Sequence, residues 1–387
     1  MPPKRRRIPR VALLIETTRT YSRDLLAGIR RYLAEHTPWS TFLELRALDS
    51  APPPWLKNWD GDGILSRTFT QETADLIAAR GLPTVELRSS YLNPHIPVIG
   101  MDNRLIGQLV AEHFLERGYR QFAAYRLGSE RFFDERMRYF ITAVKAAGCP
   151  CVELPEEISD SVADWEKNQT HLIAWINKLP KPVGIFAAND QMGVRLLDAC
   201  QRAGIAVPAQ VAVVGAENEE TLCSFATPPL SSVQFNGAEV GYLAAQMLDR
   251  MMTTKDKFPR VTLVPPKSIV VRASSDDLVI SDQLVVQAAR LIREKSTEGI
   301  SVKDLCRLLN VSRSTLERRM ATALNVTPKD EILRIRFREA ERLLCDTELT
   351  IDVIAKQTGF TESRYLQSAF KERYGQTPGI FRQSHRR

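Results

Sequence analysis

The chain has 387 residues, of which 44% are hydrophobic and 26% charged, and its formal net charge is +7. This length exceeds what one compact core usually holds, so two or three domains are expected, and the composition excludes a disordered or fibrous protein. The six cysteines are scattered, which argues against a disulfide framework or a zinc cluster and is typical of a cytoplasmic protein.

The first ten residues form a basic tail that carries Lys4–Arg7, and we interpret it as a disordered end rather than a DNA-reading arm. The apolar run that follows, Val11–Ile15, is closed by Glu16 and lacks a small-residue cleavage site. It is too short for an export signal, and no stretch of the chain is long enough to span a bilayer. We therefore expect a buried first strand, a cytoplasmic location and no membrane partner.

From residue 11 to about residue 275, short β-rich runs alternate with amphipathic helical stretches. This alternation predicts a two-lobed α/β domain with parallel sheets over 11–275, and chain crossings between the lobes are expected near 100–103 and 231–236. The predicted strands are Val11–Ile15, Gly63–Leu65, Thr84–Leu87, Pro97–Gly100, Phe122–Tyr125, Val183–Ala187 and Val211–Val214, and the predicted helices include Asn103–Arg117, Arg136–Ala147, Gln191–Ala203 and Ala238–Met252.

Ligands of such sheets bind beyond the carboxyl ends of the strands. Residues at those points are rich in carboxylates, amides and hydroxyls, which suit a small polyhydroxyl ligand because its hydroxyls both donate and accept hydrogen bonds. A Gly-rich phosphate loop is absent, and no cofactor or metal site is expected. The candidates for ligand binding are Glu16, Thr17, Thr18, Asn189, Asp190, Glu217 and Asn218, and Ser66, Arg67, Asp102 and Arg126 follow other strands.

A short polar linker at 276–282 separates this part from the last hundred residues, which have a helical pattern throughout. Residues 281–387 contain 20 Lys and Arg against 14 Asp and Glu, so they hold +6 of the net charge. Concentrated basic charge is what binding to a phosphate backbone requires, although many basic faces are only solvated.

The C-terminal region, 283–387, contains an internal repeat of apolar helix, tight turn and second helix, at about 302–324 and 351–374. Each copy ends in Thr-Pro, Thr361 is the expected N-cap in the second, and the helical stretch between the copies is expected to fix their spacing. One helix-turn-helix pattern is as often simple packing as DNA binding. Two copies on one helical spacer in a basic region predict DNA binding.

The second helix of each copy, about Arg313–Leu324 and Glu362–Tyr374, is expected to enter successive major-groove segments about 34 Å apart on one DNA face. Exposed polar side chains early in these helices are the candidates for reading bases, and later basic ones for contacting phosphates. The base-reading candidates are Arg313, Ser314, Glu317, Arg318, Glu362, Ser363, Arg364 and Gln367, and the phosphate candidates include Arg319 and Lys371.

The segment "IAKQTGFTESRYLQSAFKERYGQTPGIFR" (354–382) resembles the signature of the AraC/XylS family of transcription regulators, and the similarity spans about 285–385. Leu366 stands where that family usually has Phe, and Asn310-Val311 replaces a commoner apolar pair. The resemblance implies an all-α DNA-binding domain with two helix-turn-helix units that acts on operator DNA as an activator, and it leaves room for a contact with RNA polymerase.

The runs at 102–125, 136–148 and 185–218 are similar to the periplasmic-binding-protein-like (type I) effector domain of the LacI/GalR repressors. This resemblance implies a bound sugar, a homodimer, and ligand contacts from Arg136, Asn189, Asp190 and Glu217. Glu217 stands where that family commonly has Asp. From the residues alone, Asn189 and Asp190 could also cap the helix that follows them, and the two roles are compatible.

The order of the two domains resembles that of the xylose operon regulators, which implies a D-xylose-responsive activator of pentose-use genes. The alternatives are the same architecture sensing another sugar or metabolite, or a transport receptor, which would need an export signal and no DNA-binding module. No nucleophile-elbow, zinc-protease or Walker motif is present, so no enzyme is expected.

Overall fold

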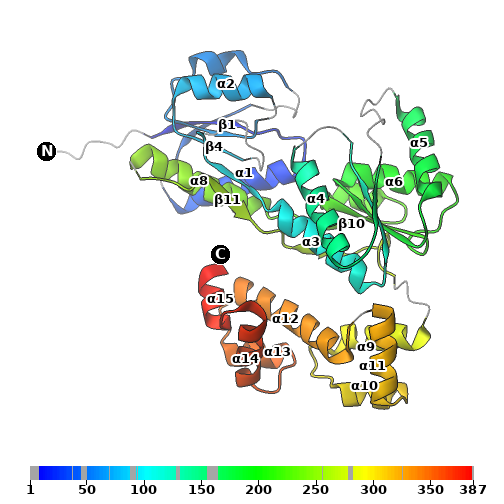
Figure 1. Cartoon of the computed structure of the whole chain (residues 1–387). Helices are drawn as coiled ribbons and strands as arrows, with labels where there is room; N and C mark the ends of the chain where they lie inside the picture. The colour runs from blue at the N-terminus through cyan, green and yellow to red at the C-terminus, as the bar shows by residue number, and fades with distance from the viewer. Residues whose placement is uncertain are drawn as a thin grey trace. The chain divides into compact units, whose positions relative to one another are not determined.

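The computed structural model describes residues 8–36, 38–44, 50–68, 70–87, 93, 95–127, 131–154, 164–254, 256–277, 282–324 and 326–385. It divides into an N-terminal unit, Met1–Leu115 and Tyr119–Asp277, and a C-terminal unit, Leu278–Arg387, with which Glu116–Gly118 is grouped (Figure 1). Most of the basic N-terminal tail, 1–7, and residues 278–281 of the expected linker lie outside the described residues. No helix in the described ranges combines the length and the apolar character needed to cross a bilayer.

The N-terminal unit is built on two six-stranded sheets, one in each lobe, with helices packed around them (Figure 1). The strand order is β11-β5-β4-β3-β1-β2 in the first lobe and β12-β10-β9-β8-β6-β7 in the second. Within the second sheet only β12 runs antiparallel to its neighbour. The strands are β1 (Arg10–Leu14), β2 (Ser40–Leu43), β3 (Gly63–Ser66), β4 (Thr84–Glu86), β5 (Val98–Met101), β6 (Gln121–Tyr125), β7 (Cys151–Glu153), β8 (Val183–Ala187), β9 (Val211–Glu217), β10 (Ser231–Gln234), β11 (Val261–Val264) and β12 (Ser268–Val270).

Amphipathic helices follow most of the strands, as parallel sheets require. Two of them, α1 and α8, pack closely along each other because Gly28 and Gly241 lie against the backbone of the opposite helix. The helical segments of this unit are α1 (Thr20–Glu35), the 3-10 helix η1 (Pro54–Asn58), α2 (Gln71–Arg80), α3 (Asn103–Glu116), α4 (Arg131–Ala146), α5 (Trp165–Lys178), α6 (Asp190–Arg202), α7 (Glu220–Phe225) and α8 (Gly237–Thr253).

The predicted two-lobed α/β fold is confirmed, and the central strands lie within a few residues of their predicted positions. These strands, such as β8, are buried along their whole length, so they appear in the sequence as continuous apolar runs. The strands β2, β7, β10, β11 and β12 were not predicted. They are short, and β2 and β7 are mostly exposed edge strands without an apolar run.

The chain passes between the lobes at three places in the described ranges: after β5, after β10 and between β11 and β12. The first two passages lie close to the expected crossings. The third was missed because neither of its flanking strands was predicted. Three segments of the chain therefore connect the two lobes.

The C-terminal unit is helical throughout its described residues, with one hydrophobic cluster in each half. The long helix α12 contributes side chains to both clusters: Ile332 packs in the first, and Phe337, Ala340 and Leu344 pack in the second. Its helices are α9 (Gln283–Lys295), α10 (Val302–Leu309), α11 (Arg313–Leu324), α12 (Pro328–Asp346), α13 (Ile351–Gln357), α14 (Ser363–Tyr374) and α15 (Pro378–His385).

The turns of the two helix-turn-helix copies differ in length. Asn310 ends α10 in the left-handed conformation with φ 51°, and Gly359 takes that conformation, with φ 77°, after α13. Ser312 caps α11 by accepting a hydrogen bond from the backbone of Thr315. The predicted cap at Thr361 is wrong: the longer second turn puts Glu362 at the N-cap position, and its side chain makes no capping bond.

Candidate ligand cleft and DNA-binding surface

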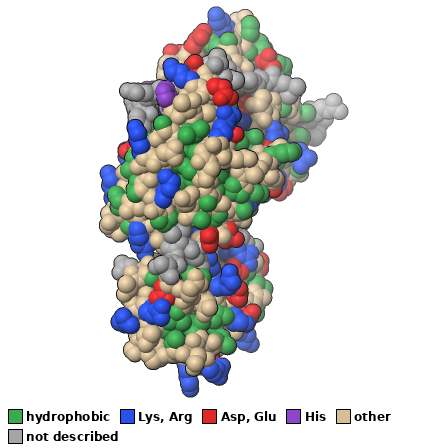
Figure 2. All heavy atoms as spheres, turned by 90° about the vertical axis from the view of Figure 1, so that its right-hand side faces the viewer, with side chains coloured by type: hydrophobic (Ala, Val, Ile, Leu, Met, Phe, Trp, Pro, Cys, Tyr) green, Lys and Arg blue, Asp and Glu red, His purple; other side chains and the backbone are tan. Residues whose placement is uncertain are grey.

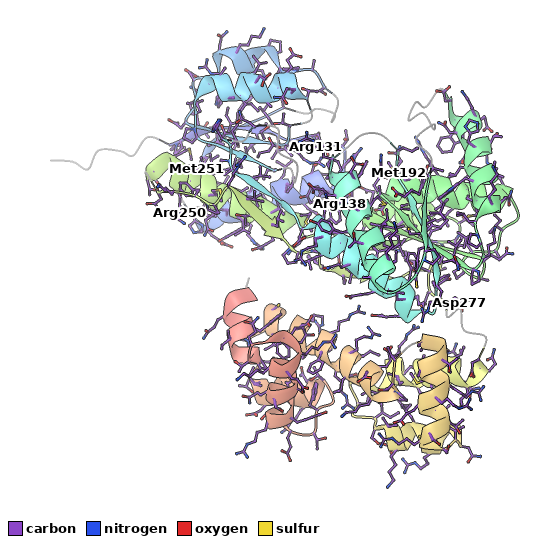
Figure 3. All side chains as sticks on the ribbon, in the orientation of Figure 1. Arg131, Arg138, Met192, Arg250, Met251 and Asp277 are labelled. Atoms are coloured by element: carbon purple, nitrogen blue, oxygen red, sulfur yellow. The ribbon has the colours of Figure 1, made fainter. Side chains whose placement is uncertain are left out.

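A cavity of about 350 Å³ lies between the two lobes of the N-terminal unit. Thr18 and Arg19 come from the loop after β1 in the first lobe, whereas Asn189, Asp190 and Glu217 come from the carboxyl ends of β8 and β9 in the second. A smaller inner cavity, of about 20 Å³, adjoins Glu217 and is lined by Tyr21, Arg67, Leu87, Met101, Phe132, Arg136 and Phe235. Figure 3 labels Arg131, the first residue of α4, and Met192, in the first turn of α6, on the second lobe.

Arg136 is buried at the back of the inner cavity, where its guanidinium donates to the carbonyl of Ala188 at 2.6 Å and to Asn103 Oδ1 at 3.3 Å. Three aromatic rings, those of Phe132, Phe133 and Phe235, lie between 5.1 and 5.5 Å from it. Burial lowers the pKa of Arg136 to about 10, and the negative charge of Glu217 opposes this shift. The side chain therefore keeps its positive charge at neutral pH.

Arg136 was expected to open its helix, and this detail is wrong. The helix α4 begins at Arg131, so Arg136 lies in its second turn. The additional turn carries Phe132 and Phe133, whose rings pack against the guanidinium and bury it. An arginine in this position is fixed by cation–π contacts as well as by hydrogen bonds.

Glu16 lies behind the cavity with its side chain almost completely buried. One carboxylate oxygen accepts from Ser22 at 2.5 Å and from Arg67 at 2.6 Å, and the other accepts from Thr18 and from the backbone of Arg19. These donors lower the pKa of Glu16 although burial alone would raise it. With both oxygens occupied, Glu16 holds Arg67 and the loop after β1 in place.

Asn189 and Asp190 combine structural contacts with a place on the cavity wall. Asn189 Oδ1 caps α6 by accepting from the backbone of Met192, so the capping role considered from the sequence is present. Asp190 accepts from the hydroxyl of Ser232 at 2.5 Å and from the backbone of Glu219 at 2.7 Å. Burial raises the pKa of Asp190 to about 8.

The loop after β9 has a strained backbone at the cavity wall. Glu217 and Asn218 have φ values of 105° and 53°, which non-glycine residues rarely adopt. Glu217 lines both cavities, but the Asn218 side chain points elsewhere and accepts a hydrogen bond from Arg272 at 2.9 Å. Such strain persists only where surrounding contacts enforce it, and it is common at ligand sites.

The cavity walls contain part of the predicted ligand set and some residues that were not predicted. Thr18, Arg136, Asn189, Asp190 and Glu217 line the two cavities, whereas Glu16, Thr17 and Asn218 do not. Ser66, Asp102 and Arg126 bond within their own surroundings. Of the wall residues that were missed, Phe235 follows the unpredicted strand β10, and Phe132 precedes Arg136 by one helical turn, a spacing that could have revealed it.

One contact joins the lobes at the rim of the cavity. Glu219, on the loop after β9, accepts a hydrogen bond at 2.9 Å from the backbone of Thr20, the first residue of α1. Its carboxylate also lies 3.7 Å from Arg23. A carboxylate at a helix N-terminus interacts favourably with the helix dipole, so this contact stabilises the observed arrangement of the lobes.

In the C-terminal unit, the exposed side chains of α11 and α14 form the candidate DNA-binding surface. Arg313 pairs with Glu317 at 2.7 Å on α11, and Ser314 and Arg318 are exposed on the same helix. On α14 and at its N-cap, Glu362, Arg364, Gln367 and Lys371 are exposed, and Ser363 is half-buried. Figure 2 shows Lys and Arg side chains, with Asp and Glu among them, over one face of this unit.

Arg319 differs from the other candidates because its guanidinium forms a two-bond ion pair with Asp282, at 2.5 and 2.6 Å. Asp282 is also the N-cap of α9, and the hydrogen bond from Arg319 lowers its pKa. This ion pair argues against the expectation that Arg319 contacts phosphate, because its guanidinium is already bonded within the protein. The ion pair also links α11 to the start of α9.

The loop that precedes the first helix-turn-helix copy contacts both the spacer helix α12 and the turn of the second copy. Arg336, on α12, donates to the carbonyls of Ser296 and Ile300, which lie between α9 and α10. The turn at Gly359 lies against the same loop: a Cβ there would be 2.3 Å from the Ser296 carbonyl oxygen. Leu366, the residue that departs from the AraC/XylS pattern, fills the second core cluster. The copies are thus held in one orientation by more than the connecting helix.

Three family descriptions match successive parts of the chain. Residues 10–104 match the XylR N-terminal domain, residues 111–275 a periplasmic binding protein-like domain, and residues 305–384 a helix-turn-helix domain.

The chain is also similar to whole regulatory proteins. It is 30% identical to the xylose operon regulatory protein of Haemophilus influenzae, over 96% of this chain and 98% of that protein. It is 29% identical to the protein of the same name from Escherichia coli K12, over 96% of each chain. A solved structure described as the xylose-binding transcription activator xylR matches with a TM-score of 0.64 and 28% identity, covering 99% of this chain and all of the other. A transcriptional regulator CelR–cellobiose complex, at 20% identity and a TM-score of 0.57, shares the fold over 70% of this chain.

Proposed function

The chain belongs to the family of xylose operon regulatory proteins and is a sugar-responsive, DNA-binding transcription regulator, and from this premise we propose that its effector is D-xylose. The observation that carries the proposal is the cleft between the lobes. It presents the carboxylate of Glu217 and the guanidinium of Arg136 to one space, with aromatic rings beside them. Carboxylate acceptors, guanidinium donors and apolar ring faces together match the hydroxyls and the C–H surface of a sugar.

In this proposal, Glu217 and Asn189 bond to sugar hydroxyls, and Arg136 donates from the opposite side. Glu16 acts indirectly by holding Arg67 towards the inner cavity. Asp190 fixes the backbone of Glu219 and contributes to the wall of the larger cavity. Thr17 and Asn218, which line neither cavity, are not assigned a ligand contact.

The DNA-binding role of particular residues is likewise a proposal. Arg364 and Gln367, exposed early on α14, read base edges, and Arg313, Ser314, Glu317 and Arg318 do so on α11. Lys371 contacts phosphate. The family membership supports an activator that works in the cytoplasm as a homodimer, contacts RNA polymerase and has no catalytic activity of its own.

The proposed mechanism is a shift between two arrangements of the lobes. A sugar that contacts both lobes favours the arrangement in which Glu219 reaches the start of α1, and it can shift this equilibrium only by its differential affinity for the two states. Allosteric coupling is typically about 1–3 kcal/mol, so D-xylose is expected to tighten operator binding roughly 5- to 150-fold. Operator DNA must tighten D-xylose binding by the same factor.

The test is a titration of the wild-type chain and of Glu217→Gln with D-xylose, L-arabinose, D-ribose and D-glucose, using calorimetry and operator binding. Glu217→Gln keeps the side-chain size but removes a charged acceptor, whose hydrogen bond is worth about 1.5–3 kcal/mol. Its D-xylose affinity should therefore fall roughly 10- to 150-fold. Glu153→Gln, at an exposed position on β7, is the matched control and should retain wild-type affinity.

Two results would count against the proposal. A wild-type chain that binds another of these sugars and not D-xylose would reassign the effector. An unchanged D-xylose affinity in Glu217→Gln would remove this residue from the binding site.

A further inference from the structure

The four residues from Glu217, the last of β9, to Glu220, the first of α7, alternate between two surroundings. Glu217 and Glu219 line the larger cavity. The residues between and after them face the other way: Asn218 Oδ1 accepts from Arg272 Nη2 at 2.9 Å, and Glu220 lies 2.5 Å from the same nitrogen. The side chains of Asn218 and Glu220 are therefore both bonded to the same guanidinium group.

Arg272 is itself firmly held. Its side chain is only 12% exposed, and its Nη1 donates to the carbonyl of Leu230 at 2.9 Å. Its backbone N–H and carbonyl both bond to the hydroxyl of Ser231, the first residue of β10. A movement of the loop after β9 must therefore either break these bonds or move Arg272.

Arg272 lies on the segment by which the chain leaves the sugar-binding unit. This segment follows β12 and runs to Asp277, the last residue of the N-terminal unit. Two residues after Arg272, Ser274 donates from its hydroxyl to the carbonyl of Val213 and accepts from the backbone of Ser231. The exit segment is thus bonded to β9 and β10, the two strands that end at the cavity.

The start of the C-terminal unit, where the chain arrives from the N-terminal unit, is held in a similar way. Asp282, the first described residue after the connecting segment, is paired with Arg319 of α11. An arginine therefore anchors the chain on each side of the link, one beside the cavity loop and one on a candidate recognition helix. Only residues 278–281 separate these two anchored ends along the chain.

We propose that Arg272 is the positioning residue that couples sugar binding to the DNA-binding unit, by joining the outer side of the 217–220 loop to the exit segment. The inference rests on the proposed function, because it assumes that a sugar contacts Glu217. The strained backbone of Glu217 and Asn218 suits this role: a loop held in a rare conformation changes state readily when a ligand alters the contacts that enforce it.

The proposal is tested in the full-length chain with Arg272→Met and the milder Glu220→Gln, whose side chain is 70% exposed and lines neither cavity. D-Xylose affinity is measured by calorimetry without DNA. Operator affinity is measured with and without D-xylose, on a duplex selected from a random pool by the wild-type chain. The control is Arg202→Met, which removes a more exposed ion-pair network, with Glu166 and Asp198, on the same lobe.

We expect the substitutions to leave the affinities for sugar and for operator nearly unchanged but to reduce the effect of the sugar on operator affinity. In Arg272→Met, D-xylose and sugar-free operator affinities stay within about threefold of wild type, while the D-xylose-dependent tightening of operator binding falls to near onefold. Glu220→Gln loses part of the tightening, and Arg202→Met loses none. A merely structural role for Arg272 would lower the melting temperature and the affinities but would leave the ratio of operator affinities intact.

Three outcomes distinguish this inference from the proposed function. Full tightening in both Arg272→Met and Glu220→Gln overturns the coupling role while leaving D-xylose as effector. If Arg272→Met does not fold, undiminished tightening in Glu220→Gln is sufficient to overturn it. A wild-type chain that shows no binding of D-xylose overturns the proposed function, and this inference with it.

Discussion

Asp190 carries a carboxyl group that the fold has removed from water. The hydrogen bonds that it accepts from Ser232, from the backbone of Glu219 and from Cys223 do not fully compensate for this burial. Its pKa is raised to about 8 in the folded chain, whereas an unfolded Asp titrates near pH 4. Between these values the folded state binds a proton that the unfolded state has released. The stability contributed by this proton is complete below about pH 4 and is lost as the pH rises towards 8.

We therefore expect the sugar-free chain to become less stable between pH 5 and pH 8, by up to about 1.4 kcal/mol for each pH unit. Asp190→Asn imitates the protonated form, because its amide can donate to Ser232 and accept from Glu219, so it should flatten this slope. The free energy of unfolding is measured in urea at several pH values. Asp60→Asn, at a carboxylate that is 76% exposed, should keep the wild-type slope. Equal slopes in wild type and Asp190→Asn would contradict the expectation.

Basic side chains on α14 fall into two positions that predict different effects. Arg364 lies in the first turn, where recognition helices meet base edges, and Lys371 lies two turns later. Arg364→Ala should cost about 1–3 kcal/mol on the preferred site and change base preference at a few positions. Lys371→Ala should weaken all sequences alike and reduce the salt dependence by about one phosphate contact.

These effects are measured by selection from a random DNA pool and by salt titration of the selected site. Specificity that is unchanged in Arg364→Ala would remove it from the base-reading set. Arg319→Ala is a useful comparison in the same experiment. Because Arg319 is paired with Asp282, we expect this substitution to disturb the position of α11 rather than to remove a phosphate contact.

At the scale of elements, the relative placement of the two helix-turn-helix copies depends on a close backbone approach. Gly359 has φ 77°, and its α-carbon faces the carbonyl oxygen of Ser296 and the backbone nitrogen of Gly299. Only glycine permits both the conformation and the distance. Gly375 has a nearly identical φ of 72°, but a Cβ added there would meet nothing within 4 Å, so it provides a matched control.

Gly359→Ala should therefore destabilise the C-terminal helices more than Gly375→Ala does. Both substitutions carry the conformational cost of a left-handed alanine, about 1–2 kcal/mol, and only the first adds a steric clash. Hydrogen exchange of amides in α9 to α14 of the full chain measures the difference, and operator affinity should fall further in Gly359→Ala. Equal effects of the two substitutions would show that the contact with Ser296 does not position the copies.

At the scale of the whole molecule, the C-terminal unit has its own two core clusters and the greater part of the net positive charge. We expect residues 281–387, expressed alone, to fold as a helical domain and to bind DNA. The affinity should fall steeply with salt, because each neutralised phosphate releases counterions. Circular dichroism and a salt titration of DNA binding test this. A folded fragment without measurable DNA affinity at low salt would contradict the assignment of DNA binding to this unit.

Much of the architecture depends on features that are local in the sequence. The buried central strands appear as continuous apolar runs, and the helix-turn-helix repeat appears as helical periodicity interrupted by turn residues. Several cavity residues, such as Thr18, Asn189 and Glu217, were found because chain order alone places them just beyond predicted strands. These patterns need no knowledge of which distant segments meet.

Only the tertiary structure decided which hydrogen-bond or ion-pair partner each polar side chain has. Glu16 is occupied by Arg67, 51 residues away, and Arg319 is occupied by Asp282, 37 residues away. Arg272 reaches Asn218 over 54 residues, and no local pattern marks any of these pairs. A carboxylate or a guanidinium has the same appearance in the sequence whether it faces a ligand, DNA or a partner in the protein. The choice is made by which segments the folded core brings within about 3 Å, because hydrogen bonds and ion pairs weaken rapidly beyond that distance.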